Sequence, residues 1–377
     1  MVPSGLIARH NDFHPKRARS LFMDQRLQQL NQWLAVQFKE HQFNDESFTV
    51  SPVSGDASFR RYFRVEQHST SSCWIAMDAP PEKEASLPFV AIARHWESKG
   101  IKVPHIQAVD LSQGFMLLGD FGDDLMLNSL NPSFNETKAS QLYKSALQTL
   151  TQIQQCSQPN DYALPPYNAK LLSREMELFR DWLVSKKLEI KLSASENELI
   201  DKAFQFLIDE ALSQPMVCVH RDYHSRNLME IDDQASDSPS IGVLDFQDAV
   251  MGPITYDPVS LLRDCYIALP PEFVDQRLQE FYQATQSVKL HDATYPQFKQ
   301  WFDLMGIQRH LKAAGIFARL SLRDGKHSYL NDIPRTVNYI EQISANYVQL
   351  QAFNQWLNSK VIPAIQDKLL SDNCEYS

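Results

Sequence analysis

The chain has 377 residues, of which 43% are hydrophobic, enough for one large or two moderate globular domains with real cores. Its formal net charge of -10, with no long block of either sign, argues against nucleic acid or an anionic membrane as the main partner. No run approaches the roughly 20 apolar residues that a membrane-spanning helix needs. The five cysteines form no CxxC pair, which predicts reduced thiols in a soluble cytoplasmic protein.

The first 22 residues contain no apolar core of a secretory signal, and we expect residues 1–22 to be either a disordered tail or the product of a start codon assigned too far upstream. An amphipathic helix is predicted from Met23 to Phe38, because apolar residues recur there at a spacing of three to four. They are Leu27, Leu30, Leu34 and Phe38.

The next segments alternate between strand and helix patterns. A hairpin is predicted over Phe48–Val65, a third strand over Cys73–Met77 and a helix over Pro88–Lys99. Two more strands follow over Val103–Ala108 and Gly114–Leu118. This order is typical of a small nucleotide-binding lobe built on an antiparallel sheet, and we assign it residues 23–118.

Residues 119–122, which contain two glycines, predict a hinge. Beyond it, residues 123–377 are mainly helical, with stripes over Thr137–Gln154 and Leu171–Leu183. Two strand-like runs, Met216–Val219 and Ile241–Phe246, interrupt the helices. The fold class is therefore α+β, a protein-kinase-like two-lobed fold with a larger, mainly helical C-lobe. Four prolines are expected to end helices there: Pro270, Pro271, Pro334 and Pro363.

The run from His220 to Asn227 contains HRDxxxxN, and a later strand ends in Asp245 and Phe246. These pieces match the catalytic loop and the metal-binding aspartate of kinases in order and spacing. A carboxylate must accept the hydroxyl proton, while an amide oxygen and a second carboxylate hold Mg²⁺ against the phosphates. Asp222, Asn227 and Asp245 fill these three roles.

A simpler interpretation is that these residues only cap turns, which Asp and Asn commonly do. The full spacing favours catalysis. His220 is expected to shape the loop by hydrogen bonding rather than to carry a proton. His224, two positions after Asp222, either touches the transferred phosphoryl group or faces solvent.

The hairpin turn is predicted to cover the phosphates through Gly55, Asp56 and Ser58. Strand alternation places Arg60 and Arg64 on one face and Arg61 on the other, so at least one guanidinium points at phosphate or all three are solvated.

Kinases normally carry a lysine on the third strand, but this strand reads Trp74-Ile75-Ala76-Met77-Asp78. We expect Lys83 or a hairpin arginine to replace it, or the metal and the backbone to suffice. Adenine is expected at main-chain groups of Gly119, Asp120 and Phe121.

These motifs resemble the aminoglycoside phosphotransferase and choline kinase superfamily, and within it the anomeric N-acetylmuramate/N-acetylglucosamine kinases of bacterial cell-wall recycling. The resemblance extends over most of the chain and includes the missing lysine. It is carried by Val219 through Asn227, Leu244 through Ala249, Gly252-Pro253, Tyr256-Asp257-Pro258, Pro52 through Arg64, Met77 through Glu84 and Arg309 through Lys312.

The resemblance implies an ATP- and Mg²⁺-dependent kinase that phosphorylates the C1 hydroxyl of an amino sugar. Arg174, Arg309 and Lys312 are then candidates for the sugar pocket. A muramate lactyl carboxylate would require a cation, for which Arg309, Lys312 and Arg319 are candidates, although charged residues on a helix are more often solvated. Asp257 is expected to be buried and to accept N–H bonds from the catalytic loop. GTP in place of ATP and the oligomeric state stay open.

Two rival functions stay open as well. The same fold acts on other hydroxyl substrates such as choline, homoserine, an aminoglycoside or a protein serine; a choline pocket would need an aromatic cage. A catalytically dead nucleotide sensor is suggested by the absent lysine, but the complete set of Asp222, Asn227 and Asp245 argues against it.

Overall fold

A computed structural model describes residues 16–40, 47–53, 59–68, 72–130, 135–231 and 239–370. The chain divides into two compact units. Unit 1 comprises residues 1–87 and 105–120, and unit 2 comprises residues 88–104 and 121–377. No helix in the described ranges is long and apolar enough to cross a membrane.

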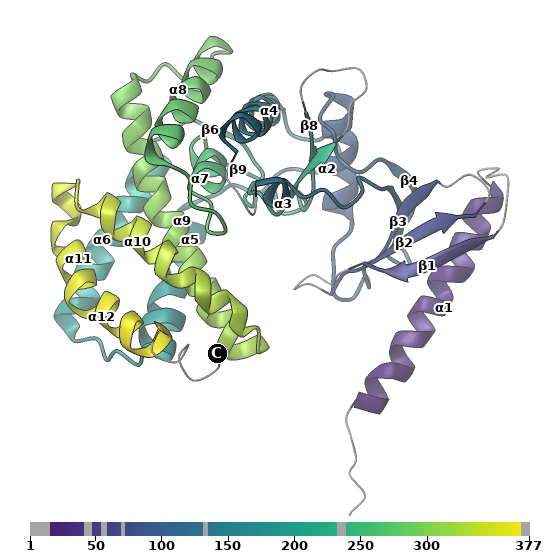
Figure 1. Ribbon diagram of the computed structural model, residues 1–377, viewed down its shortest axis with the longest axis horizontal. Coiled ribbons are helices and arrows are strands. Elements are labelled where there is room, and N and C mark those ends of the chain that lie inside the picture. Colours follow the sequence, from purple (N-terminus) through teal and green to yellow (C-terminus); the bar gives the residue numbers. More distant parts are fainter. Residues whose placement is uncertain are drawn as a thin grey trace, which may run out of the picture. The chain divides into compact units, whose positions relative to one another are not determined.

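Unit 1 is built on a five-stranded antiparallel sheet with the strand order β1-β2-β3-β5-β4 (Figure 1). Four of the five strands had been predicted close to their observed positions, and the fourth in sequence begins later than expected. The strands are β1 (Phe48–Pro52), β2 (Arg61–Gln67), β3 (Cys73–Asp78), β4 (Ile106–Asp110) and β5 (Phe115–Gly119).

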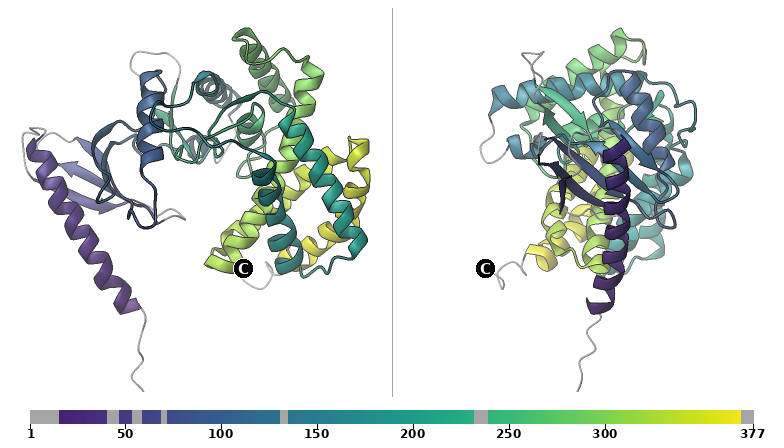
Figure 2. Two further views of the ribbon diagram at one scale, coloured as in Figure 1. Left: turned by 180° about the vertical axis from the view of Figure 1, so that it is seen from behind. Right: turned by 90° about the vertical axis from the view of Figure 1, so that its right-hand side faces the viewer.

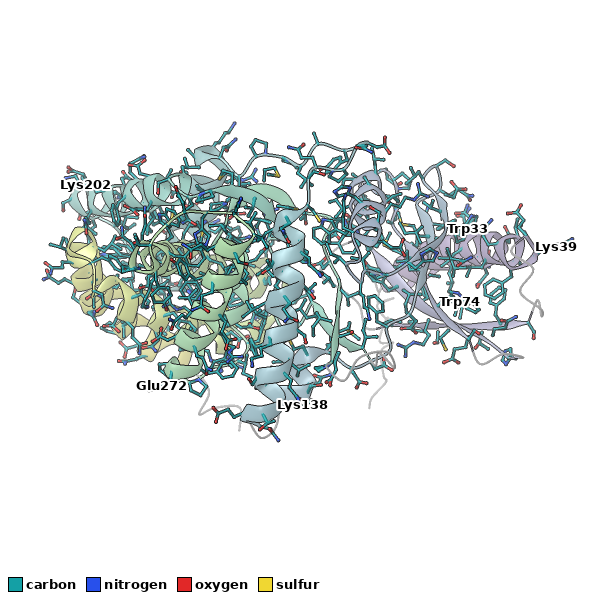
Figure 3. The ribbon with its side chains drawn as sticks, turned by 90° about the horizontal axis from the view of Figure 1, so that it is seen from above. Trp33, Lys39, Trp74, Lys138, Lys202 and Glu272 are labelled. Carbon is teal, nitrogen blue, oxygen red and sulfur yellow. The ribbon has the colours of Figure 1, made fainter. Side chains whose placement is uncertain are left out.

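Helix α1 (Lys16–Glu40) covers one face of this sheet, as the two views in Figure 2 show. It begins before Met23, inside the segment expected to be a tail. Its buried Leu30 and Leu34 pack on Phe63 and Val65 of β2, and Trp33 of α1 belongs to the same cluster. Figure 3 labels Trp33 together with Trp74 of β3, which packs against that cluster. The face of the sheet that carries Phe63 and Val65 is therefore the core face of unit 1.

Unit 2 is mainly helical, and its fold together with unit 1 confirms the predicted α+β class. Helix α2 (Leu87–Ser98) opens it. The others are α3 (Met126–Leu130), α4 (Glu136–Gln155), α5 (Ala169–Leu178), η1 (Phe179–Lys187), α6 (Ala194–Leu212), α7 (Tyr256–Leu262), α8 (Pro271–Ser287), α9 (Tyr295–Asp324), η2 (His327–Asp332), α10 (Ile333–Ser344), η3 (Val348–Leu350), α11 (Gln351–Trp356), η4 (Leu357–Val361), α12 (Ile362–Ile365) and η5 (Gln366–Leu370).

Two short antiparallel ladders lie among these helices. Strand β6 (Met216–Val219) pairs with β9 (Val250–Pro253), and β7 (Leu228–Ile231) pairs with β8 (Ser240–Val243). The patterns of β7 and β9 had not been recognised. The predicted strand over Ile241–Phe246 is shorter than expected, because the chain leaves it after Val243. These ladders fix the loop that carries Asp222.

Helix α9 is the centre of unit 2 and packs against α5, η1, α6, α7 and α10. A Cβ atom at Gly315 would lie 2.2 Å from the carbonyl carbon of Leu178, so only glycine permits this approach. The contact falls where α5 ends and the π-helical η1 begins. Glycine at this position thus lets α9, which carries the sugar-pocket candidates Arg309 and Lys312, approach α5, which carries Arg174.

The four prolines expected to end helices lie at helix starts, which corrects that prediction. Pro270 is the N-cap of α8 and Pro271 its first residue. Pro334 and Pro363 lie in the first turns of α10 and α12. The reason is that proline has no N–H, and the first turn of a helix leaves its N–H groups without helical partners anyway.

Candidate active site

The loop from His220 to Asn227 joins β6 to β7, and hydrogen bonds to the side chain of Asp257 anchor it. The Asp257 side chain is fully buried. One of its oxygens accepts the main-chain N–H of His220 at 2.7 Å, and the other accepts that of Arg221 at 3.0 Å. These are the bonds expected from the resemblance. They hold the two residues that precede Asp222 in a single conformation.

His220 is buried and ties the loop to the segment that follows β8. Its Nε2 lies 2.8 Å from the carbonyl oxygen of Leu244, and its Nδ1 accepts the main-chain N–H of Asp222 at 3.2 Å. Both ring nitrogens are therefore engaged by the main chain. Burial lowers the pKa of His220, so the ring is neutral at pH 7. The arrangement is that of a shaping residue rather than a proton carrier.

Arg221 adopts a φ of 77°, a left-handed conformation that costs a non-glycine residue about 1–3 kcal/mol. Both terminal nitrogens of its guanidinium donate hydrogen bonds. Nη2 donates to Glu175 at 2.8 Å, and Nη1 donates to the carbonyl oxygen of Asp248 at 3.3 Å. Together with the bond to Asp257, these contacts maintain the strained backbone directly before Asp222.

The Asp222 carboxylate lies in a strongly positive environment. Burial by itself raises the pKa of Asp222, but nearby positive charges, Lys312 foremost, outweigh it and lower the pKa to about 2. Arg221 and Arg309 contribute in the same direction. Asp222 is therefore ionised at neutral pH. It can accept a hydrogen bond from a substrate hydroxyl and take its proton late in the reaction.

Asn227 and Asp245 are brought together by the β7–β8 hairpin. Asn227 immediately precedes β7, Asp245 follows β8, and Leu228 pairs with Val243. The main-chain N–H of Leu244 donates to the carbonyl oxygen of Asn227 at 2.9 Å. The Asn227 side-chain amide donates to the carbonyl oxygen of Asp222 at 3.0 Å, which turns its Oδ1 away from that bond. The hairpin therefore joins the two metal candidates to the loop that carries Asp222.

Asp245 has a φ of 60° and receives a side-chain bond from Gln247, whose Nε2 lies 2.6 Å from Asp245 Oδ1. An amide oxygen and a carboxylate are hard ligands of the kind that Mg²⁺ prefers. In the part of the chain that the structure describes, no cluster of three or more His, Cys, Asp or Glu side chains is arranged to hold a metal. A site built from Asn227 and Asp245 would thus take its other ligands from phosphate and water.

His224 is packed edge-on against the ring of Tyr266, with ring centroids 5.2 Å apart. Burial lowers its pKa to about 4, although the carboxylates of Asp264 and Asp222 oppose that shift. Its Nδ1 is buried and has no partner among the described residues. His224 is therefore a neutral ring within this loop, and its Nδ1 has no hydrogen-bond partner among the described residues.

The three sugar-pocket candidates lie in different surroundings. Arg174 of α5 is exposed. Arg309 and Lys312 of α9 are both buried, and the charge of each acts on Asp222. Lys312 Nζ lies 3.3 Å from Glu175 and donates to the Tyr256 hydroxyl at 2.9 Å. Of the three candidates, Arg309 and Lys312 are the two whose charges act on the Asp222 carboxylate.

Sequence reasoning missed three residues of this site: Glu175, Gln247 and Asp264. Glu175 links Arg221 to Lys312, and Tyr167 donates its hydroxyl to it. A signal for Glu175 was present, because it falls on the apolar stripe of its helix, where a charge must have a partner. Gln247 and Asp264 gave no such signal.

The nucleotide-binding candidates lie mostly in unit 1. Gly55, Asp56 and Ser58 lie outside the described residues. Arg60 pairs with Glu84 at 3.1 Å, and the exposed Lys83 lies over the Phe59 ring at 5.3 Å. Met77 of the third strand, which carries no lysine, is fully buried.

Arg61 lies on the core face of the sheet, where it and Arg26 of α1 both pair with the buried Asp78. Arg64 lies on the opposite face and donates to Asp120 at 2.7 Å. Of the adenine candidates, Gly119 is the last residue of β5 and Asp120 and Phe121 follow it; the boundary between the two units falls between Asp120 and Phe121.

Comparison with known proteins identifies the class. Residues 49–291 match the model of the phosphotransferase enzyme family, and the chain belongs to that family. This confirms the resemblance inferred from the motifs around Asp222 and Asp245.

Among curated proteins, the chain is 42% identical to an N-acetylmuramate/N-acetylglucosamine kinase of Pseudomonas putida, over 85% of this chain and 92% of the relative. It is 37% identical to a kinase of the same name from Neisseria meningitidis serogroup B, over 86% of this chain and 93% of the relative. Among solved structures, an ethanolamine kinase of Plasmodium vivax aligns with a TM-score of 0.57 at 12% identity, covering 78% of this chain and 82% of that one. The last similarity shows the shared fold.

Proposed function

We propose that this protein transfers the γ-phosphoryl group of ATP to the C1 hydroxyl of N-acetylmuramate or N-acetylglucosamine. One observation carries the proposal: the Asn227 side-chain amide donates to the carbonyl oxygen of Asp222, and the Asn227 carbonyl oxygen accepts the N–H of Leu244, the residue before Asp245. A dead nucleotide sensor would not need a strained and multiply anchored loop before an ionised carboxylate. The named relatives support the choice of an amino sugar as acceptor.

Asp222 acts as the proton acceptor. The sugar oxygen forms a new bond to the γ-phosphorus while the bond from that phosphorus to the bridging oxygen breaks, and its electron pair leaves with ADP. The hydroxyl proton passes to the Asp222 carboxylate. The low pKa of Asp222 fits a loose transition state, in which the proton moves late and the carboxylate chiefly orients the hydroxyl.

Asn227 and Asp245 hold Mg²⁺, which neutralises phosphate charge when it is bound. Gln247 keeps the Asp245 carboxylate in place through its 2.6 Å bond. His220 bonds to the main chain of both Asp222 and Leu244, and so fixes the position of Asp222 relative to the residue that precedes Asp245. The protein residues thus act as positioning groups, in keeping with a reaction whose catalysis depends mainly on placement and charge.

The first lobe, which we propose comprises residues 23–118, binds the nucleotide. Gly119, Asp120 and Phe121 form the hinge and meet adenine through main-chain groups. Residues 123–377 bind the sugar, with Lys312 and Arg309 lining its pocket. We place the enzyme in the cytoplasm, where ATP is available to a kinase of cell-wall recycling; the four described cysteines are free thiols, as that compartment requires.

A substrate panel tests the proposal. Purified protein with Mg²⁺ and either ATP or GTP should form nucleoside diphosphate with both amino sugars and not with choline, homoserine or an aminoglycoside. Phosphorus–proton correlated NMR should locate the new phosphate on C1. The methyl glycoside of N-acetylglucosamine lacks the free C1 hydroxyl and should be inert. Phosphorylation of that glycoside, or activity confined to choline, would refute the assignment.

A further inference from the structure

Helix α9 presents two buried cations to the catalytic loop, and they differ in their partners. Lys312 has a carboxylate at 3.3 Å, that of Glu175, and a hydroxyl at 2.9 Å, that of Tyr256. Arg309 lies one turn earlier on the same side of the helix and is 6% exposed. No carboxylate of the described residues lies within 4.0 Å of its guanidinium, whereas Lys312 is neutralised by a direct ion pair.

The guanidinium of Arg309 makes one weak bond with the described residues. Its Nη1 donates to the Cys265 Sγ at 3.6 Å. The remaining nitrogens of Arg309 are not among the polar atoms that are sealed from solvent without a partner, so they open into accessible space. A guanidinium has five N–H donors in a rigid fork. Most of the fork is therefore available to a ligand.

The carboxylates that act on Arg309 from a distance are already engaged. Asp264 accepts the N–H and the hydroxyl of Ser225 through one oxygen and the N–H of Tyr266 through the other. Asp222 is the base. Burial opposes the charge of Arg309, but Cys265 and Tyr256, followed by Asp264 and Asp222, outweigh burial and raise the pKa of Arg309 above its usual value, so Arg309 stays charged. Among the described residues, this charged guanidinium has no direct carboxylate partner.

We infer that Arg309 binds the carboxylate of the lactyl ether on N-acetylmuramate and thereby distinguishes this sugar from N-acetylglucosamine. The inference rests on the proposed function. A planar carboxylate matches the guanidinium fork with two parallel hydrogen bonds. Buried polar donors otherwise pair with protein or water, so an open fork in this position is suited to an acidic ligand. Arg309 is a specificity-determining residue in this scheme, while Lys312 serves the loop through Glu175.

The first test alters the substrate and leaves the protein intact. The methyl ester of N-acetylmuramate retains the lactyl group but loses its charge. With the wild-type enzyme, kcat/KM should fall about 10- to 100-fold from the acid to the ester, the usual effect of a lost charge-assisted hydrogen bond. Equal kcat/KM for acid and ester would overturn the inference.

The second test combines substrate and variant. Arg309→Gln should lower kcat/KM for N-acetylmuramate about 10- to 100-fold more than it lowers kcat/KM for the ester and for N-acetylglucosamine, and so abolish the preference for the acid. Arg309→Lys, which keeps the charge without the fork, should be intermediate. The control is Arg319→Gln on the same helix, whose charged neighbours are Arg323 and Asp324 rather than Asp222. It should retain the wild-type preference.

A third result would assign Arg309 another role. If Arg309→Gln slows both sugars and the ester by the same factor, Arg309 serves Asp222, the phosphoryl group or the fold, and the inference fails. That result leaves the proposed function intact. If the wild-type enzyme phosphorylates neither sugar, the proposed function fails, whatever Arg309 does. The two failures are therefore distinguishable in one set of assays.

Discussion

The carboxylate of Asp257 accepts a hydrogen bond from the main-chain N–H of His220 at 2.7 Å, in a fully buried position. The two residues are far apart in the sequence, and the bond attaches the start of the catalytic loop to helix α7. Burial raises the pKa of Asp257 to about 6, while His220 and the N–H bonds counteract it. The position of the catalytic loop thus depends on a residue that does not touch the reaction.

Asp257→Ala should lower the free energy of unfolding by about 2–4 kcal/mol, because two buried N–H donors, those of His220 and Arg221, lose their acceptors. Turnover should fall with it. Urea unfolding followed by circular dichroism measures the change. Asp248→Ala is the control, since this side chain is exposed and should alter stability by less than about 0.5 kcal/mol. Equal midpoints for the two variants would contradict the anchoring role.

Asp222→Asn should lower kcat by about 10²- to 10⁴-fold, because the amide keeps the shape of the side chain but cannot take the hydroxyl proton. ATP affinity and the unfolding midpoint should stay close to those of the wild type. Steady-state kinetics and isothermal titration with ATP measure the two quantities. Wild-type turnover in this variant would remove Asp222 from the base role.

Asp245→Ala should weaken nucleotide binding in the presence of Mg²⁺ and leave it unchanged in EDTA, because the lost group is an anionic metal ligand. Titration of ATP with Mg²⁺ and with EDTA separates the metal-dependent part of the binding free energy from the metal-independent part. Gln247→Ala should produce a smaller loss, since it removes only the 2.6 Å bond that orients Asp245. An unchanged difference between Mg²⁺ and EDTA would mean that the metal is held elsewhere.

Local patterns predicted most of the fold of unit 1, because alternation and helical spacing report burial directly. They failed for β7 and β9, which have four residues each and depend on partners distant in the sequence. The prolines illustrate a related limit. A proline excludes a helix interior but allows a first turn, and only the chain after Pro271 or Pro334 decides between the two.

The spacing of the motif identified the groups that the structure joins in one network, Asp222, Asn227 and Asp245. The spacing of a motif can identify such groups because residues close in the sequence determine the geometry of a loop or a hairpin. The partners of these groups are not local: Glu175 reaches Arg221 of the loop from α5, and Lys312 pairs with Glu175 whereas Arg309 has no carboxylate partner among the described residues. Pairings of this kind follow from tertiary packing and were not predictable from one sequence.

Acidification should destabilise the protein, and His310 contributes to the effect. This side chain is buried, and its Nε2 lies 2.9 Å from the carbonyl oxygen of Arg263. Burial foremost, with the neighbouring Arg309, lowers its pKa from 6.5 to about 3. Between these two pKa values, His310 is protonated in the unfolded chain and neutral in the folded chain. The free energy of unfolding therefore rises with pH across this range and falls on acidification.

His310→Asn should therefore reduce the slope of unfolding free energy against pH between about pH 4 and 6, by up to about 1.4 kcal/mol per pH unit. Asp257 acts in the opposite direction, because its raised pKa makes stability fall as pH rises from 3.8 to about 6. Asp257→Ala should accordingly steepen the slope. Urea titrations at several pH values measure it, and parallel curves for wild type and His310→Asn would show that His310 does not contribute.

The last prediction concerns the cation that replaces the lysine of the third strand. A triphosphate carries more negative charge than one metal site offsets, and an arginine beside the predicted phosphate loop is the expected source. The structure separates the two candidates. Arg61 lies on the core face, where it pairs with the buried Asp78, and Arg60 pairs with Glu84 at 3.1 Å. Arg61 is thus committed to the interior of unit 1.

Arg60→Ala should raise the KM for ATP and slow turnover while leaving the unfolding midpoint nearly unchanged. Arg61→Ala should do the reverse: it lowers stability, because Asp78 is fully buried and keeps only Arg26 as a cation partner within the described part of the chain, but it affects the KM for ATP little. Lys83→Ala is the comparison for an exposed cation in the same region. ATP kinetics and urea unfolding of the three variants decide the matter. If none of them alters the KM for ATP, metal and main chain alone hold the phosphates, and no side-chain cation replaces the lysine.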